Sequence, residues 1–222
     1  MRKITADRVF IFVFLFVLVL AAGIASALLT LGTLPLGDFR GIVLVLAAGA
    51  LAWGYAVIVY RMLLWLLPLP TGEIQEGSRH EAVYHIYALF YLIFFNPVMR
   101  SGLLPIPMTR LLYRALGARI GENTYSGGII YDAPFVELGA NCLIGEHALL
   151  VPHVIEGRRL ALYPIRVGNG VTIGARATVL ADVSIGDNAI VATGAVVIKG
   201  TRIGPGEIWG GIPARKLNTQ TA

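Results

Sequence analysis

The chain has 222 residues, of which 56% are hydrophobic and only 14% are charged, so it is too apolar for an ordinary soluble domain. Its net charge is +5, but the sequence has no basic cluster interleaved with aromatic residues, and nucleic acid is not expected as a partner. The single cysteine, Cys142, excludes a disulfide framework.

The apolar residues are concentrated in two runs near the N-terminus, residues 9–31 and 42–67. A transmembrane helix needs about 20 apolar residues to cross a hydrocarbon core of about 30 Å, and each run is long enough. A short loop, residues 32–40, joins the runs. Residues 1–70 are therefore predicted to form a transmembrane helical hairpin.

Positive charge flanks the first run, in Arg2, Lys3 and Arg8. In the joining loop the opposite charges of Asp38 and Arg40 nearly cancel. The positive-inside rule therefore places both termini in the cytoplasm. The sequence thus predicts an integral protein of the inner membrane whose C-terminal part faces the cytoplasm. A secretory signal peptide is the alternative for the first run, but this run is longer than a typical signal core and a second run follows it.

Residues 71–117 are predicted to contain a linker and interfacial helices. Proline lacks an amide donor and clashes with the preceding helical turn, so Pro68 and Pro70 should end the second run. Residues 79–95 form an apolar, tyrosine-rich segment that favours the headgroup boundary, which predicts an interfacial or re-entrant helix. Asn96-Pro97 is expected to end this helix.

A second short helix is predicted over residues 108–116, with Arg110, Arg114 and Arg119 on or near one side. These arginines would meet anionic lipid headgroups or an anionic substrate, and a solvated helix face explains them equally well. His80 and His85 belong to the preceding helix, where packing or headgroup contact is the default interpretation.

A six-residue period organises the sequence from Val167 to Ala214. Aliphatic residues open successive blocks at Val167, Ile173, Val179, Ile185, Val191, Val197 and Ile203, and Trp209 opens the last. Small or β-branched residues follow four positions later, at Val171, Ala177, Val183, Ala189, Ala195 and Thr201. A period of six suits neither a helix nor a single strand, but it is typical of a parallel β-helix in which each coil buries its face on the next.

The period breaks between Leu150 and Val167, whose separation of seventeen is not a multiple of six. A loop is therefore predicted at about residues 151–166, and loops on rigid scaffolds often carry function. His153 stands where the regular wall ends, and imidazole suits a general base because its pKa lies near neutrality. His147, at an outward position of a regular repeat, is the second candidate base.

A catalytic histidine works better when a carboxylate fixes its tautomer and stabilises the imidazolium. Three acidic residues are candidates: Glu146, Glu156 and Asp132. Glu156 lies in the same predicted loop as His153, and each of the three could equally be a solvated carboxylate in a turn.

The Ile-Gly-x-x-Ala/Val-x repeats close on the sequence Gly210-Gly211-Ile212-Pro213-Ala214-Arg215-Lys216. They resemble the hexapeptide-repeat acyltransferases, which fold as left-handed parallel β-helices. The resemblance covers residues 118–217 and leaves residues 218–222 as a tail. It is closer to the membrane-embedded hexapeptide-repeat units at the end of some peptide-synthetase-like proteins. The implied fold class is mixed: a transmembrane hairpin and interfacial helices, followed by a left-handed parallel β-helix.

The resemblance implies transfer of an acyl group from acyl-CoA (acetyl-CoA or longer), or from a carrier-protein thioester, to a hydroxyl or amine of a membrane-associated acceptor. The implied partners are membrane lipids, an acyl or peptidyl carrier protein, and two further copies of the chain in a homotrimer with active sites between subunits. It places the catalytic histidine at His153, an acidic catalytic residue at Glu156 and a substrate-contacting aspartate at Asp132.

The family binds CoA along the outside of the coils, with the pantetheine arm on backbone groups. By position in the repeats, the resemblance assigns the backbone donors to Ala175 and Thr193, and the phosphate partners to Lys199 and Arg215. Lysine acts on phosphate as a point charge and arginine as a bidentate fork, so the residue types fit.

Two other functions are alternatives to acyl transfer. Some β-helix relatives are zinc or iron carbonic anhydrases that use three histidines, but only His147 and His153 lie in the repeat region, so no metal is expected. The remaining alternative is a non-catalytic, membrane-anchored β-helix scaffold, for which His153→Ala would leave function intact.

Overall fold

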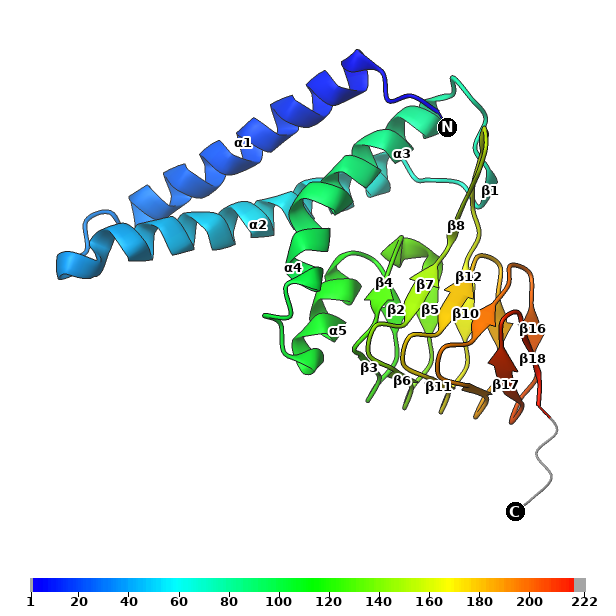
Figure 1. Ribbon diagram of the computed structural model, residues 1–222. Helices are drawn as coiled ribbons and strands as arrows, with labels where there is room; N and C mark the ends of the chain where they lie inside the picture. Colours follow the sequence, from blue (N-terminus) through cyan, green and yellow to red (C-terminus); the bar gives the residue numbers. More distant parts are fainter. Residues whose placement is uncertain (1, 218–222) are drawn as a thin grey trace. The chain divides into compact units, whose positions relative to one another are not determined.

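The computed structural model describes residues 2–217, which form two compact units (Figure 1). The helical unit contains residues 2–69 and 76–97, and the coil unit contains residues 70–75 and 98–217. The predicted tail, residues 218–222, lies outside the described residues.

Two long helices begin the helical unit: α1 (Ala6–Leu31) and α2 (Arg40–Leu66), joined through the short turn η1 (Gly37–Phe39). They lie side by side as an antiparallel pair (Figure 1). The pair packs closely at Gly23, where an added Cβ would lie 2.7 Å from the backbone of Ala48 and Ala52. Small residues allow such close approach between apolar helices. Both helices are long and apolar enough to cross a membrane.

A third long helical segment consists of α3 (Arg79–Phe90), the π-helical turn η2 (Tyr91–Phe95) and α4 (Asn96–Arg100). The prediction that Asn96-Pro97 ends this helix is wrong. The N–H of Asn96 bonds to the carbonyl of Tyr91, five residues back, and this wider turn relieves the clash that Pro97 would make in a regular α-helix. Residues 79–100 are also long and apolar enough to cross a membrane, and the interfacial placement stays a prediction.

Aromatic rings hold the three helices of this unit together. Phe12 of α1 meets Phe90 of α3 edge-to-face with ring centroids 5.3 Å apart. Tyr60 of α2 stacks on Tyr87 at 5.3 Å. His85 is buried with Nδ1 2.5 Å from an Arg8 Nη1, which agrees with a packing role, whereas His80 is exposed.

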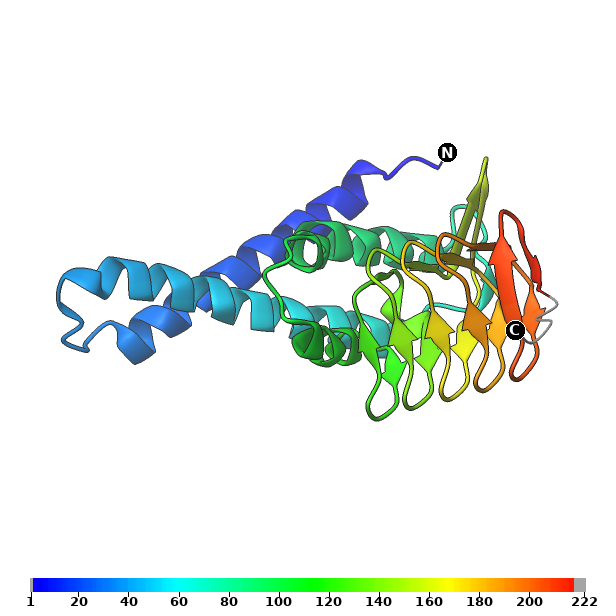
Figure 2. The same cartoon turned by 60° about the horizontal axis from the view of Figure 1, so that its bottom comes forward.

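The coil unit is a prism of stacked coils with three parallel sheets (Figures 1 and 2). Face 1 contains β2 (Arg119–Ile120), β5 (Val136–Leu138), β10 (Ile165–Val167), β13 (Ser184–Ile185) and β16 (Arg202–Ile203). Face 2 contains β3 (Tyr125–Ser126), β6 (Leu143–Ile144), β11 (Thr172–Ile173), β14 (Ile190–Val191) and β17 (Ile208–Gly211), with β18 (Ala214–Lys216) antiparallel at its edge. Face 3 contains β4 (Ile129–Ile130), β7 (Leu149–Val151), β12 (Thr178–Leu180) and β15 (Val196–Val197).

The six-residue period is confirmed as the packing rule of these coils. Val167 pairs with Ile185 eighteen residues later, so three blocks make one coil. The aliphatic openers from Val167 to Ile203 are 6% exposed or less, and the small residues from Val171 to Ala195 are 1% exposed or less. Trp209 instead stays half-buried, and its Nε1 donates to Glu207 Oε2 at 2.8 Å.

The predicted excursion at residues 151–166 is an antiparallel hairpin of β8 (His153–Glu156) and β9 (Arg159–Leu162). A third strand, β1 (Gly72–Glu73), pairs with β9 from the linker that follows α2. The N–H of Ile74 donates to the carbonyl of Leu160 at 2.8 Å, and Ile74 is 1% exposed. Residues 71–75, the first part of the predicted linker, are thus part of the coil unit.

Helix α5 (Ile106–Ala115) closes the N-terminal end of the coils. Its buried Tyr113 donates to the carbonyl of Gly128 and accepts from the N–H of Ile130, both at 3.1 Å. Burial raises the pKa of Tyr113 to about 12, so the hydroxyl stays neutral and keeps its donated bond.

Candidate active site

The candidate base and its carboxylate lie where two strands of face 3 end, at the corner between faces 3 and 1 (the 3–1 corner). Asp132 follows β4 and His153 follows β7, and these strands are neighbours in the sheet. Asp132 has a left-handed backbone with φ of +44°, and the turn η3 (Ala133–Phe135) follows it. The Nδ1 of His153 lies 2.5 Å from Oδ2 of Asp132.

The pair is largely shielded from water. The Asp132 side chain is 7% exposed and the His153 side chain is 26% exposed. The ring of Tyr131 meets the imidazole edge-to-face with centroids 5.8 Å apart, and the Tyr131 hydroxyl accepts from Arg100 Nη2 at 2.7 Å. The Tyr131 ring leaves the imidazole of His153 little freedom to rotate away from the Asp132 carboxylate.

Two opposing influences set the protonation of His153. Burial is the largest and lowers its pKa, but the hydrogen bond to Asp132 and the negative charge of that carboxylate together outweigh it, so the pKa of His153 is raised. When Nδ1 donates to the carboxylate, the neutral ring carries its free lone pair on Nε2. This tautomer is the one that can accept a proton from a substrate.

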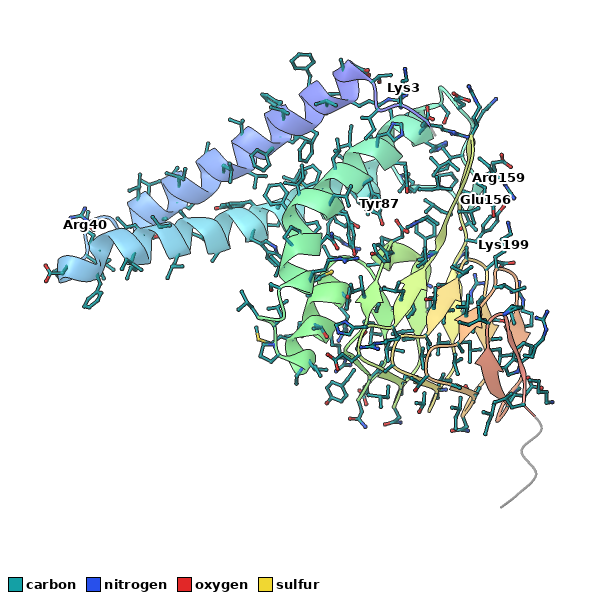
Figure 3. All side chains as sticks on the ribbon, viewed as in Figure 1. Lys3, Arg40, Tyr87, Glu156, Arg159 and Lys199 are labelled. Atoms are coloured by element: carbon teal, nitrogen blue, oxygen red, sulfur yellow. The ribbon has the colours of Figure 1, made fainter. Side chains whose placement is uncertain are left out.

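Glu156 occupies the opposite end of β8 and has different partners. It accepts a hydrogen bond from Lys199, and its Oε2 lies 3.6 Å from Arg159 Nη1. The hydrogen bond from Lys199 holds the pKa of Glu156 below its usual range. Figure 3 shows Glu156, Arg159 and Lys199 gathered beside the hairpin. The structure therefore brings Asp132, and not Glu156, to His153.

A cavity of about 270 Å³ lies beside the hairpin. Its wall includes Val154, Tyr163 and Ala181, which pack together, and its rim includes Lys199 and Arg159. Because successive side chains of a strand point to opposite faces, Val154 and His153 lie on opposite sides of β8. The cavity thus borders the strand that carries His153 without containing the imidazole.

His147 lies at the other end of β7, at the corner between faces 2 and 3 (the 2–3 corner). Its exposed imidazole has Nε2 3.4 Å from Oε1 of Glu146. The turns that contain Ala175 and Thr193 stack along the same corner, linked by a 2.9 Å bond from the N–H of Gly194 to the carbonyl of Ala175. Within residues 2–217, the N–H groups of Ala175 and Thr193 donate to no other group, so both are available to a ligand.

The predicted site residues therefore fall into separate groups within one chain. Asp132, His153, Glu156 and Lys199 share the 3–1 corner, and His147, Ala175 and Thr193 share the 2–3 corner. Arg215 is exposed on β18, opposite Gly210. In the part of the chain that the structure describes, no three His, Cys, Asp or Glu side chains converge in the way a metal site requires.

Comparison with known proteins gives matches to one family model and to several relatives. A family model described as bacterial transferase hexapeptide (six repeats) matches residues 164–199. The "Putative acetyltransferase YvoF" of Bacillus subtilis (strain 168) is 32% identical over 120 residues, which cover 52% of this chain and 69% of that protein. The "Delta-poly-L-ornithine synthetase" of Acinetobacter baumannii (strain AB307-0294) is 24% identical over 184 residues, which cover 78% of this chain but only 13% of that protein.

Among solved structures, a hexapeptide-repeat-containing acetyltransferase of Vibrio cholerae O1 biovar eltor, complexed with acetyl coenzyme A, is 27% identical with a TM-score of 0.43. The match covers 48% of this chain and 62% of that one. The share of each relative's own length that this chain spans thus ranges from 13% to 69%.

Proposed function

Because the chain belongs to the hexapeptide-repeat acyltransferases, whose C-terminal fold is a left-handed parallel β-helix, we propose that it moves an acyl group from a thioester to a hydroxyl or amine of a membrane-associated acceptor. The donor is acyl-CoA or a carrier-protein thioester. His153 is the general base and Asp132 is the carboxylate that orients it. The contact of 2.5 Å between His153 Nδ1 and Asp132 Oδ2 carries this proposal.

The reaction uses the free lone pair on His153 Nε2. This nitrogen takes the proton of the acceptor hydroxyl or amine while the acceptor oxygen or nitrogen bonds to the thioester carbon. Asp132 stabilises the imidazolium that forms. The carbon–sulfur bond then breaks, and the imidazolium returns its proton to the leaving thiolate. The balance is one acyl group transferred and one free thiol released.

The backbone donors at the 2–3 corner are proposed to hold the donor. The N–H groups of Ala175 and Thr193 are spaced along consecutive coils, which suits the amide carbonyls of a pantetheine arm, and a backbone donor of this kind can also stabilise the oxyanion. Lys199 and Arg215 supply positive charge for the phosphates of CoA. A phosphate would compete with Glu156 for Lys199.

One chain alone does not bring the base to these donors, because His153 and Ala175 lie at different corners of face 3. In a closed ring of three prisms, the 3–1 corner of one chain meets the 2–3 corner of its neighbour when face 3 points toward the threefold axis. The site is then completed between adjoining chains. We therefore propose a homotrimer built around face 3.

The outward side chains of the faces support this arrangement. Those of face 3 are apolar or small and half-buried: Ile129, Leu149, Thr178 and Val196. Those of face 1 are mostly charged and suit water: Arg119, Glu137, Arg166, Ser184 and Arg202. Charged residues are depleted from the centres of protein interfaces, so face 3 is a better contact surface than face 1.

The path of the chain supports an acceptor in the bilayer. Gly72, Leu162 and His153 stand in register across three strands, so Gly72 and His153 are two strand spacings, about 10 Å, apart. Gly72 follows Leu66, the end of α2, by six residues, which reach at most about 20 Å. If α2 spans a membrane, His153 is therefore within about 30 Å of the end of that span. The arginine and lysine near the N-terminus place this side in the cytoplasm.

The test is thioester cleavage by the purified full chain in proteoliposomes. Acyl-CoA of increasing chain length and an acyl carrier protein are offered with lipid acceptors, and released thiol is measured. We expect acceptor-dependent thiol release that His153→Ala abolishes while the oligomer stays intact. Absence of thiol release from every donor by the unaltered protein, or equal release by His153→Ala, would instead favour the non-catalytic scaffold.

A further inference from the structure

We propose that α5 and the loop before it form a lipid-contact surface that seats the N-terminal end of the coils on an anionic bilayer. This inference rests on the proposed membrane-bound function. The surface, named the cap face, consists of Leu103, Ile106, Met108, Leu111, Arg110 and Arg114.

The cap face exposes large apolar side chains along α5 and the loop before it. Leu103 is 84% exposed, Leu111 65%, Ile106 52% and Met108 50%. Scattered exposed leucines are ordinary, but four large apolar side chains within nine residues form a patch of the kind that marks a binding surface.

The opposite side of α5 is fixed to the first coil, so the helix has no freedom to turn these side chains inward. Tyr113 is buried with two hydrogen bonds to the first coil, and Thr109 Oγ1 donates to the carbonyl of Ser126 at 2.9 Å. Leu112 is also buried beside them. The coil unit therefore presents the cap face outward as a rigid feature of its N-terminal end.

The charge around the patch favours an anionic partner. Residues 101–115, which comprise α5 and the loop before it, contain two arginines, Arg110 and Arg114, and no acidic residue. Arg110 and Arg114 lie one helical turn apart and border Leu111, and Arg114 is exposed. A helix with an apolar face bordered by arginines binds in the interface of an anionic membrane. A second copy of the chain would bring arginines against arginines, so the charge favours lipid over self-association.

The length of the preceding chain places the cap face near a membrane. Arg100 ends the third candidate span, and Ile106 begins α5 six residues later. Six residues reach at most about 20 Å. If the third helix spans, α5 therefore starts within about 20 Å of the hydrocarbon core, and the innermost about 5–8 Å of that distance is the polar layer of the bilayer.

This surface specifies where the acceptor approaches. Asp132 belongs to the first coil and His153 follows the second, so the proposed base lies at the same end of the prism as the cap face. An acceptor anchored in lipid can then reach the 3–1 corner without leaving the bilayer.

The test places an environment-sensitive fluorophore on Leu111→Cys of the full chain in proteoliposomes that contain brominated anionic lipid. Cys142 is 2% exposed and stays unlabelled. Ile190→Cys, an exposed apolar position on face 2 in a later coil, is the matched control. We expect bromolipid to quench the dye at position 111 and not at position 190. A basic residue near an anionic surface strengthens binding about fivefold. The double substitution Arg110→Gln with Arg114→Gln should therefore lower the ratio of membrane-bound to unbound cap face about 25-fold.

Equal quenching at the two positions, or none at position 111, would overturn the proposal. A dye at position 111 that is shielded from water but not quenched would also overturn it, because the cover is then protein and not lipid. Thiol release is measured on the unlabelled protein in the same vesicles, so failure of the cap face and failure of acyl transfer give separate results.

Discussion

The two corners of face 3 are built differently although the same strands connect them. The 2–3 corner consists of nearly identical short turns that offer backbone N–H groups at Ala175 and Thr193. The 3–1 corner is irregular, with the left-handed Asp132 and the inserted hairpin of β8 and β9. Regular repeats thus present repeated backbone groups, whereas the side chains suited to chemistry lie where the repeat is interrupted.

The largest effect on kcat is expected from a comparison of the two histidines, His153 and His147. His153→Ala should lower kcat about 1,000-fold, because a positioned general base contributes about 10²- to 10⁴-fold. His147→Ala, at the regular corner, should change kcat less than about threefold if only the interrupted corner supplies the base. Thiol release under saturating donor measures both, with size-exclusion chromatography as the control for the oligomer. The reverse ranking of the two variants would assign the base to His147.

The carboxylate at the interrupted corner gives the next effect. Asp132→Asn keeps the shape of the side chain but can hold the wrong imidazole tautomer, and kcat should fall about 100-fold or more. Glu146→Gln at the regular corner is the matched control, and it should leave kcat near that of the unaltered protein. If Asp132→Asn raises KM and leaves kcat unchanged, Asp132 contacts substrate, as the family resemblance first suggested.

A change at face 3 tests whether the two corners meet between chains. Thr178→Lys places a charge on the outward row of face 3, and Ser184→Lys places the same charge on face 1, where both neighbouring side chains are arginines. Only Thr178→Lys should dissociate the trimer and lower turnover by at least about tenfold, because a buried unpaired charge costs several kcal/mol. Light scattering measures the mass of the oligomer that each variant forms. Dissociation by Ser184→Lys alone would place the contact on face 1.

The pH dependence separates the influence of Asp132 from that of burial. His153 must be neutral to accept a proton, so kcat/KM should rise with pH, about tenfold per unit, and level off above the pKa of His153. Because Asp132 raises that pKa, kcat/KM should reach its plateau at a higher pH than a free imidazole would give. In Asp132→Asn the residual activity should level off at lower pH, since burial then acts alone. An unchanged midpoint would show that Asp132 does not set the pKa.

The smallest effect is expected at Glu156. Its ion pairs with Lys199 and Arg159 are exposed, and exposed ion pairs contribute little to stability. Glu156→Gln should therefore change kcat less than about threefold and should lower KM for CoA donors, because Lys199 is released for phosphate. Lys199→Gln should raise the same KM. A loss of kcat comparable to that of His153→Ala would restore the catalytic role predicted for Glu156.

The sequence predicts the interior of the coils well because burial there follows a fixed period. It leaves Asp132, Glu146 and Glu156 as three candidates for the carboxylate beside His153, because the first coil departs from that period. Ile130 pairs with Leu150, twenty residues later and not eighteen, and this shift brings Asp132 beside residues 152–153. The signal in the sequence was that twenty residues, and not eighteen, separate the paired positions Ile130 and Leu150. Tyr131 and Arg100, which border the imidazole, carry no pattern that would identify them.

Two further features depend on contacts that periodicity does not encode. The continuation of the third helix past Pro97 depends on the wide turn at Tyr91–Phe95, which propensity rules do not anticipate. The pairing of Gly72–Glu73 with β9 joins residues about ninety positions apart in the sequence, so no local sequence pattern predicts it. The catalytic roles stay predictions, which the variants above test.

The strand β1 has a consequence for how this protein can be shortened. A truncated chain that starts after Arg100 would keep every coil but lose the strand that covers β9. The amides and carbonyls along β9 would then face water as an open sheet edge, which recruits other strands and promotes aggregation. A soluble fragment of the coils should therefore carry residues 70–75 grafted beside the hairpin, or a charged or proline substitution along β9 that blunts the edge.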